Sequence, residues 1–179
     1  AHQQAIEQLK NCKERLFSQE TFFNSTFSWL VKTLFGDLYS GTFVSKKWLE
    51  LSVYEDGELA GSVVETLSII LADITAMLSG GKGKNHHPSF LLHDSPREAD
   101  LSPALYERLL LISVELANLF GAQGYIPFQY IVTTTTPQPE IMNKNVVLQL
   151  DNTREGMLFK EFLRIPKSED PKVEQLPLA

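Results

Sequence analysis

The segment between Ser89 and Thr136 constrains the fold of this chain more than any other part of the sequence. It contains the short apolar run SFLLH, a helical stretch from Pro103 to Phe120, and the β-prone run IVTTTT. Ser102 suits the N-cap of that helix and Pro103 suits its first position. A strand, a helix and a strand in this order predict a parallel crossover unit with a right-handed connection. The predicted fold class is therefore α/β, with helices packed on parallel strands.

Residues 1–20 are rich in Gln, Glu, Lys and Asn. Their apolar residues Ile6, Leu9 and Leu16 recur at spacings of three and seven, which is typical of a narrow helical seam. Such a seam fits the end of a coiled coil and a single amphipathic surface helix equally well. Both interpretations remain open from the sequence.

Residues 21–165 form the predicted globular part, and residues 166–179 a polar, Pro-containing and loosely ordered tail. The predicted elements before SFLLH are an aromatic helix over Phe22–Leu38, one or two strands ending in a turn at Asp56-Gly57, and a broad apolar helix over Glu58–Leu78. SGGKGKNHHP is predicted to be a mobile loop. SFLLH is predicted to be a buried strand. After IVTTTT we expect a strand in NVVLQLD and a short helix in EGMLFKEFL.

Composition excludes several classes of protein. Hydrophobic residues make up 43% and charged residues 21%, as in an ordinary soluble globular domain. The longest apolar stretch is interrupted by Glu65 and Asp73, so no membrane span is expected. A net charge of −6 argues against a basic nucleic-acid-binding surface spread over the whole chain. The lone Cys12 excludes an internal disulfide and a multi-cysteine zinc site. The N-terminal residues contain no apolar core of a secretory signal, so the cytoplasm is the expected compartment.

The carboxyl end of SFLLH is the first place to expect chemistry, because ligands of parallel sheets bind beyond the carboxyl ends of the strands. Asp94 follows this strand directly. A carboxylate at the rim of a sheet suits a nucleotide-bound Mg²⁺, although an Asp there can also be a simple turn or capping residue. His86 and His87 lie nearby in a glycine-containing loop. Their spacing matches no common zinc pattern, so exposed and unconnected histidines are expected.

These segments, with the motif FLLHDSP, resemble the C-terminal lobe of an SMC-type ATPase head of the bacterial DNA-repair and defence kind. This group belongs to the ABC-type ATPases. The resemblance covers Ala1 to about Phe162 and implies half of a head with parallel strands, packed helices and the end of a coiled coil.

The resemblance also implies roles for individual residues. Asp94 would bind Mg²⁺, and Ser95 stands where the family has a Glu that polarises the attacking water. Asp100 lies in the region of the D-loop, and Thr134 is nearest to the switch residue that senses the γ-phosphate. Because a hydroxyl is a poor base at pH 7, hydrolysis is expected to be slow or to use another residue.

Two segments could match the signature motif of the family, which begins a long helix so that amide groups face a phosphate across the dimer. Ser79-Gly80-Gly81 matches by letter but follows a helix, so Gly61 and Ser62, at the start of the long apolar helix, are the predicted signature residues. GGKGKN lacks the spacing of a phosphate-binding loop and precedes a strand. The sequence therefore predicts no Walker A site within this chain.

The resemblance implies an ATP hydrolase with ATP and Mg²⁺ as cofactors, active only when an N-terminal lobe supplies Walker A. Its further implied partners are a second head in a homodimer, DNA and accessory subunits, in DNA repair, chromosome maintenance or antiviral defence. The alternative is a head-like interaction and dimerisation module with weak catalysis, which the hydroxyl at Ser95 favours.

Overall fold

The structure is a computed structural model that describes residues 2–45, 49–59, 61–94, 101–122, 124–151, 153 and 156. The chain divides into two compact units, Ala1–Met142 and Asn143–Ala179. Apart from Gly156, the predicted helix in EGMLFKEFL and the predicted tail lie outside the described residues.

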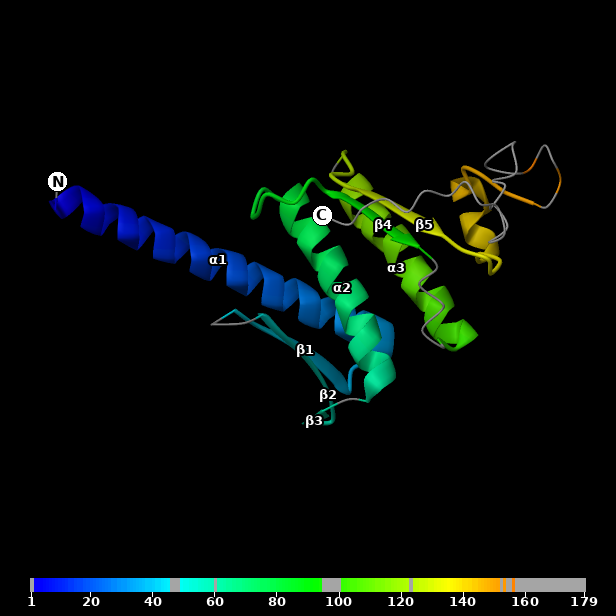
Figure 1. Ribbon diagram of the computed structural model, residues 1–179, viewed down its shortest axis with the longest axis horizontal. Coiled ribbons are helices and arrows are strands. Elements are labelled where there is room, and N and C mark those ends of the chain that lie inside the picture. Colours follow the sequence, from blue (N-terminus) through cyan, green and yellow to red (C-terminus); the bar gives the residue numbers. More distant parts are fainter. Residues whose placement is uncertain are drawn as a thin grey trace, which may run out of the picture. The chain divides into compact units, whose positions relative to one another are not determined.

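The first helix, α1, runs without a break from His2 to Phe35 (Figure 1), so the polar and the aromatic segments of the sequence form one helix. Its second half contributes Phe27, Leu30, Val31 and Leu34 to the core, where all four are fully buried. In its first half the predicted seam residues Ile6, Leu9 and Leu16 are all more than half exposed. This exposed seam fits both interpretations of the N-terminal segment.

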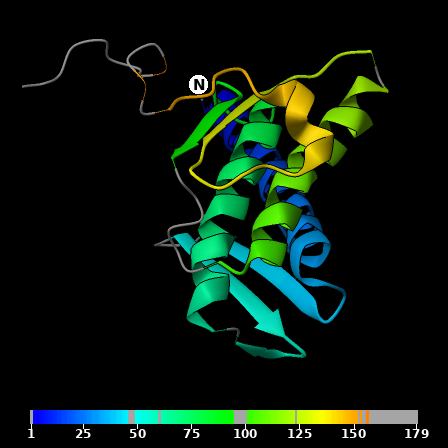
Figure 2. The same ribbon diagram turned by 90° about the vertical axis from the view of Figure 1, so that its right-hand side faces the viewer.

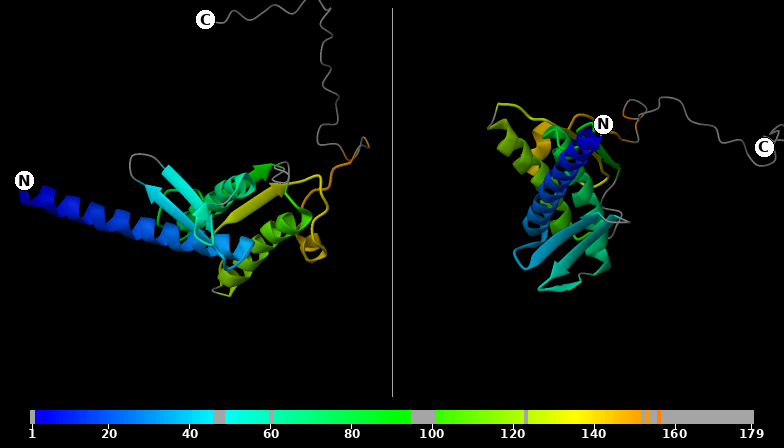
Figure 3. Two further views of the ribbon diagram at one scale, coloured as in Figure 1. Left: turned by 90° about the horizontal axis from the view of Figure 1, so that it is seen from below. Right: turned by 90° about the vertical axis from the view of Figure 1, so that its left-hand side faces the viewer.

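An antiparallel sheet follows, made of β1 (Tyr39–Ser45), β2 (Leu49–Glu55) and β3 (Glu58–Leu59). The predicted turn between β2 and β3 is confirmed, because Asp56 and Gly57 both have positive φ, as a tight hairpin requires. β1 lies along the second half of α1 (Figure 3). The Asn24 amide clamps the two together: its Nδ2 donates to the Phe43 carbonyl at 2.8 Å, and its Oδ1 accepts from the Phe43 N–H at 2.7 Å.

The second helix, α2, spans Ser62–Gly81. The predicted start at Glu58 is wrong, because Glu58 and Leu59 pair with β2 instead. Within the described residues the stretch Val64–Gly81 is long and apolar enough to cross a membrane. The expectation that Glu65 and Asp73 interrupt this stretch is therefore wrong. Half of that stretch is buried. Its members Leu67, Leu71, Ile74 and Met77 belong to the core, which accounts for the apolar composition of the helix.

The predicted crossover unit is present. It consists of β4 (Phe90–Asp94), α3 (Pro103–Gly121) and β5 (Gln129–Thr133), and the two strands pair in parallel. Ser102 is the N-cap of α3, with its Oγ accepting from the Leu105 N–H at 3.3 Å. The β2–β3 hairpin lies near the start of α2, and β4 lies near the end of α2 (Figure 2). The fold is thus a mixed α/β arrangement of helices and two small sheets.

Two local predictions need correction. Residues 146–151 belong to the predicted strand NVVLQLD and follow the short helix η2 (Glu140–Asn145). They form no strand and pair with none of the described strands. Ser79, Gly80 and Gly81 belong to the last turn of α2 rather than to a loop. In the rest of the predicted loop segment the Lys84 carbonyl accepts from Gln19, and Asn85 Nδ2 donates to the Ala76 carbonyl at 3.1 Å. The mobility of this loop stays a prediction.

Candidate functional site at the carboxyl ends of β4 and β5

Asp94 and Thr133 form the centre of the candidate site. Each is the last residue of its strand, and the parallel register places them side by side. Both side chains are exposed, and the Thr133 hydroxyl donates a hydrogen bond to Asp94 Oδ1. One carboxylate oxygen is therefore held by the neighbouring strand. The sequence placed Asp94 at the carboxyl end of this strand, which is confirmed, but it did not single out Thr133, which stands in a run of four threonines.

Thr134, the predicted switch residue, lies immediately beyond β5 in a fixed loop. Its Oγ1 accepts from the hydroxyl of Tyr106 at 2.6 Å and from the Thr136 N–H at 3.0 Å, and it donates to the Thr136 carbonyl at 3.3 Å. Tyr106 belongs to α3 and is only 2% exposed. The helix therefore holds the loop in place through this hydroxyl. The role of Thr134 toward a phosphate stays a prediction.

His93, the residue before Asp94, points to the opposite face of the sheet, because side chains alternate along a strand. Its Nδ1 lies 2.9 Å from the hydroxyl of Tyr130, and its Nε2 lies 3.3 Å from Asp73 Oδ2 on α2. Burial raises the pKa of Tyr130 above its ordinary value, and the nearby Tyr106 and Asp73 raise that pKa further. A phenol that keeps its proton donates to Nδ1, which assigns the imidazole proton to Nε2 and makes Asp73 its acceptor.

The predicted signature residue Gly61 is the N-cap of α2, and its carbonyl accepts from the Val64 N–H at 2.9 Å. No heavy atom lies within 4 Å of the position that a Cβ at Gly61 would occupy, so the start of the helix is open on that side. At a rise of 1.5 Å per residue, Gly61 lies about 18 Å from Asp73 along the axis of α2. The side chain of Ser62, and Ser95 and Asp100 as a whole, lie outside the described residues.

The oxygen ligands at this edge suit a hard cation, but they do not form a complete cage. Within the described ranges, no group of three or more His, Cys, Asp and Glu side chains could hold a metal ion. Mg²⁺ is commonly bound by one or two carboxylates together with substrate phosphates and water. Asp94 therefore fits a nucleotide-bound Mg²⁺, and the part of the chain that the structure describes offers it no group of three such side chains for a stand-alone metal site. His86 is exposed, as expected, but the expectation of an exposed and unconnected ring is wrong for His87, which is half-buried and accepts from the Ser89 N–H at Nδ1.

The face of the β4–β5 pair that carries Asp94 and Thr133 is apolar as well as exposed. Phe90 is 44%, Leu92 is 51% and Ile131 is 37% exposed. The inward residues Leu91, Tyr130 and Val132 instead pack against the core. The prediction that SFLLH is a buried strand is therefore wrong for one face, because no other described element covers the outer side of this two-stranded sheet.

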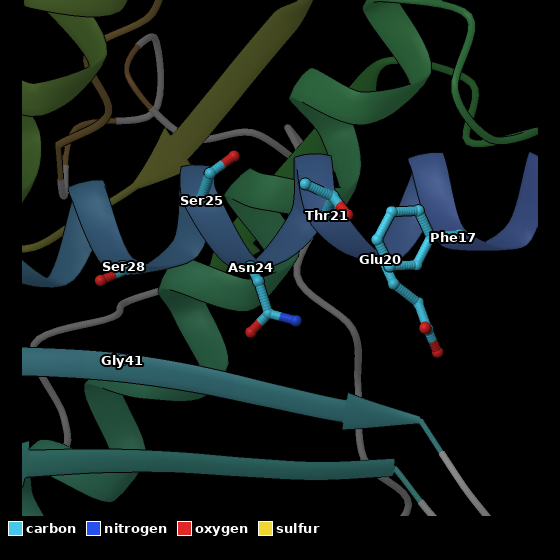
Figure 4. A pocket seen from close by; sticks show the side chains of 7 residues that line it. All are labelled: Phe17, Glu20, Thr21, Asn24, Ser25, Ser28 and Gly41. Atoms are coloured by element: carbon cyan, nitrogen blue, oxygen red, sulfur yellow. The ribbon is translucent and has the colours of Figure 1, made fainter.

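A groove of about 530 Å³ lies between α1 and β1 (Figure 4). Asn24 points across it toward the strand whose backbone it clamps. The groove is lined by Phe17, Glu20, Thr21, Asn24, Ser25, Ser28 and Gly41. None of the residues predicted for the site is among them, so the groove is separate from the chemistry expected at Asp94.

A scan against protein-family models gives no match, and a search of curated proteins gives none either.

Proposed function

We propose that this chain is the C-terminal lobe of an SMC-type ATPase head of the DNA-repair or defence kind. The observation that carries the proposal is the shared carboxyl edge of β4 and β5. Asp94 ends β4 and accepts a hydrogen bond from the hydroxyl of Thr133, which ends the parallel strand β5. The crossover helix α3 connects these two strands. A carboxylate in this position is suited to the Mg²⁺ of a bound nucleotide.

The exposed outer face of the β4–β5 pair supports the proposal that the lobe works with another one. Parallel sheets are normally covered on both faces, yet Phe90, Leu92 and Ile131 are all more than a third exposed. A second lobe that carries Walker A would add strands and cover these side chains. In this arrangement the nucleotide would lie between the two lobes, beside Asp94.

Within such a head each residue of this chain has a separate task. Asp94 would present Oδ2 to the Mg²⁺ while Thr133 occupies Oδ1. Mg²⁺ bound there would neutralise charge that develops on the phosphates. The open N-terminus of α2 at Gly61 and Ser62 would face the nucleotide of a second head, where helix amides favour a phosphate. Ser95 would orient water without acting as an efficient base, so the engaged state would be long-lived.

The decisive experiment is Asp94→Asn in this chain joined to its phosphate-loop lobe. We expect Mg²⁺-dependent ATP hydrolysis to be lost while the folded state is retained, because an exposed rim carboxylate contributes little to stability. Asp37→Asn is the matched control, since Asp37 is an exposed carboxylate in the turn after α1. If Asp94→Asn unfolds the protein and leaves activity per folded molecule unchanged, Asp94 is structural and the proposal is wrong.

Nucleotide binding by the chain alone provides a second test. Because no phosphate loop is present in the sequence, isothermal titration calorimetry should detect weak ATP binding or none. A micromolar affinity of this chain alone would contradict the proposal that it is half of a head.

A further inference from the structure

His93 is bonded through both ring nitrogens to two different elements of the fold. Nε2 reaches Asp73 on α2, and Nδ1 reaches the hydroxyl of Tyr130 on β5. The two rings also meet edge to face, with centroids 5.4 Å apart and an interplanar angle of 88°. The imidazole side chain is only 14% exposed. His93 therefore ties the end of β4 to a helix and to the neighbouring strand at once.

Packing alone does not explain an imidazole at this position. The other inward residues of the sheet are Leu91 on β4 and Tyr130 and Val132 on β5, and a leucine at 93 would continue that apolar surface. A mostly buried polar ring is costly unless its atoms are paired, but a fully paired network holds its members in one arrangement. Here both nitrogens have partners, so the network restricts where β4 ends.

We propose that His93 is a positioning residue that sets the place of the Asp94 carboxylate. The two residues are neighbours on a strand, and alternation directs His93 inward and Asp94 outward. Fixing His93 against Asp73 and Tyr130 therefore fixes the backbone from which Asp94 reaches the rim. This inference rests on the proposed function in one respect, namely that Asp94 binds a cation.

The chemistry of the ring allows the Tyr130 contact to be removed while the Asp73 contact is kept. His93→Gln can keep a donor near the position of Nε2 and so retain the bond to Asp73. Tyr130→Phe removes only the hydroxyl that reaches Nδ1 and keeps the ring that packs against His93. His93→Leu removes both bonds. Leu91→Ala is the matched control, because Leu91 lies two residues earlier on the same inward face of β4.

The measurement is the affinity for Mn²⁺, used in place of Mg²⁺, in this chain joined to its phosphate-loop lobe and saturated with ATP. Residues that orient a metal ligand typically change affinity about 10–100-fold when removed. We expect a loss of that size for His93→Leu, a smaller loss for Tyr130→Phe, and partial recovery in His93→Gln. Leu91→Ala should lower the unfolding midpoint and leave Mn²⁺ affinity per folded molecule unchanged.

Two results would separate failure of this inference from failure of the proposed function. Mn²⁺ affinity within twofold of wild type in both His93→Leu and Tyr130→Phe, with Asp94→Asn strongly impaired, would overturn the positioning role alone. Should Leu91→Ala weaken Mn²⁺ binding as much as His93→Leu does, the effect is general loss of packing and the positioning role is again wrong. Unchanged affinity in Asp94→Asn would instead contradict the proposed function.

Discussion

Replacing Gly41 with alanine is expected to disrupt the packing of β1 on α1. A Cβ at this position would lie 2.8 Å from both Phe27 Cε1 and Val31 Cγ2, and 2.9 Å from Phe27 Cδ1. Ordinary van der Waals contacts begin near 3.4 Å. Phe27 and Val31 are both 0% exposed, so neither can turn toward solvent to make room. The strand would therefore have to move away from the helix, or the core would have to repack.

The expected cost follows from overpacking of a filled core, which typically destabilises by about 1–3 kcal/mol. Against this, Gly→Ala reduces the freedom of the unfolded chain and stabilises by about 0.4–1 kcal/mol where the backbone permits it. The net loss should be about 1–2 kcal/mol, a substantial part of the 5–15 kcal/mol that is typical of natural domains.

Urea denaturation followed by tryptophan fluorescence would measure this loss as a lower midpoint with an unchanged slope. Gly121→Ala is the control, because no heavy atom lies within 4 Å of its Cβ position at the end of α3. That variant should be neutral or up to about 1 kcal/mol more stable. If Gly41→Ala is as stable as Gly121→Ala, β1 does not contact α1 as described.

Three further predictions concern separate parts of the fold. Because the pKa of Tyr130 is raised by burial, its contribution to stability is present below pH 10 and is lost as pH rises above it. Urea titrations should therefore show a decline in unfolding free energy between pH 9 and 11 that is smaller in Tyr130→Phe by about 1.4 kcal/mol in total, and an equal decline would refute this. Ser102→Ala should lower the unfolding free energy by about 1 kcal/mol through loss of the α3 N-cap, whereas Ser102→Asp should not. In the joined protein, Ser95→Glu should raise basal ATP hydrolysis about 10²–10⁴-fold if a missing base limits turnover; slower hydrolysis would mean that another residue is the base.

The sequence by itself determined the features that depend on short-range patterns. Ser102 and Pro103 predicted the start of α3, and Asp56-Gly57 predicted the turn between β2 and β3. The order of SFLLH, the α3 segment and IVTTTT predicted a parallel crossover unit. The first two follow from the conformational preferences of a few neighbouring residues. The third follows from the order of the elements, because a strand that returns through a helical crossover pairs in parallel.

Only the tertiary structure decided which distant residues meet and which strand-like segments find a partner. Thr133 reaches Asp94 across 39 positions of sequence, and Asp73 reaches His93 across 20. Glu58 continues the hairpin rather than starting α2, because β2 offers it a partner. NVVLQLD is strand-like in composition but pairs with no described strand. Strand pairing and side-chain contacts depend on what lies opposite each residue, and local propensity contains no information about that neighbour.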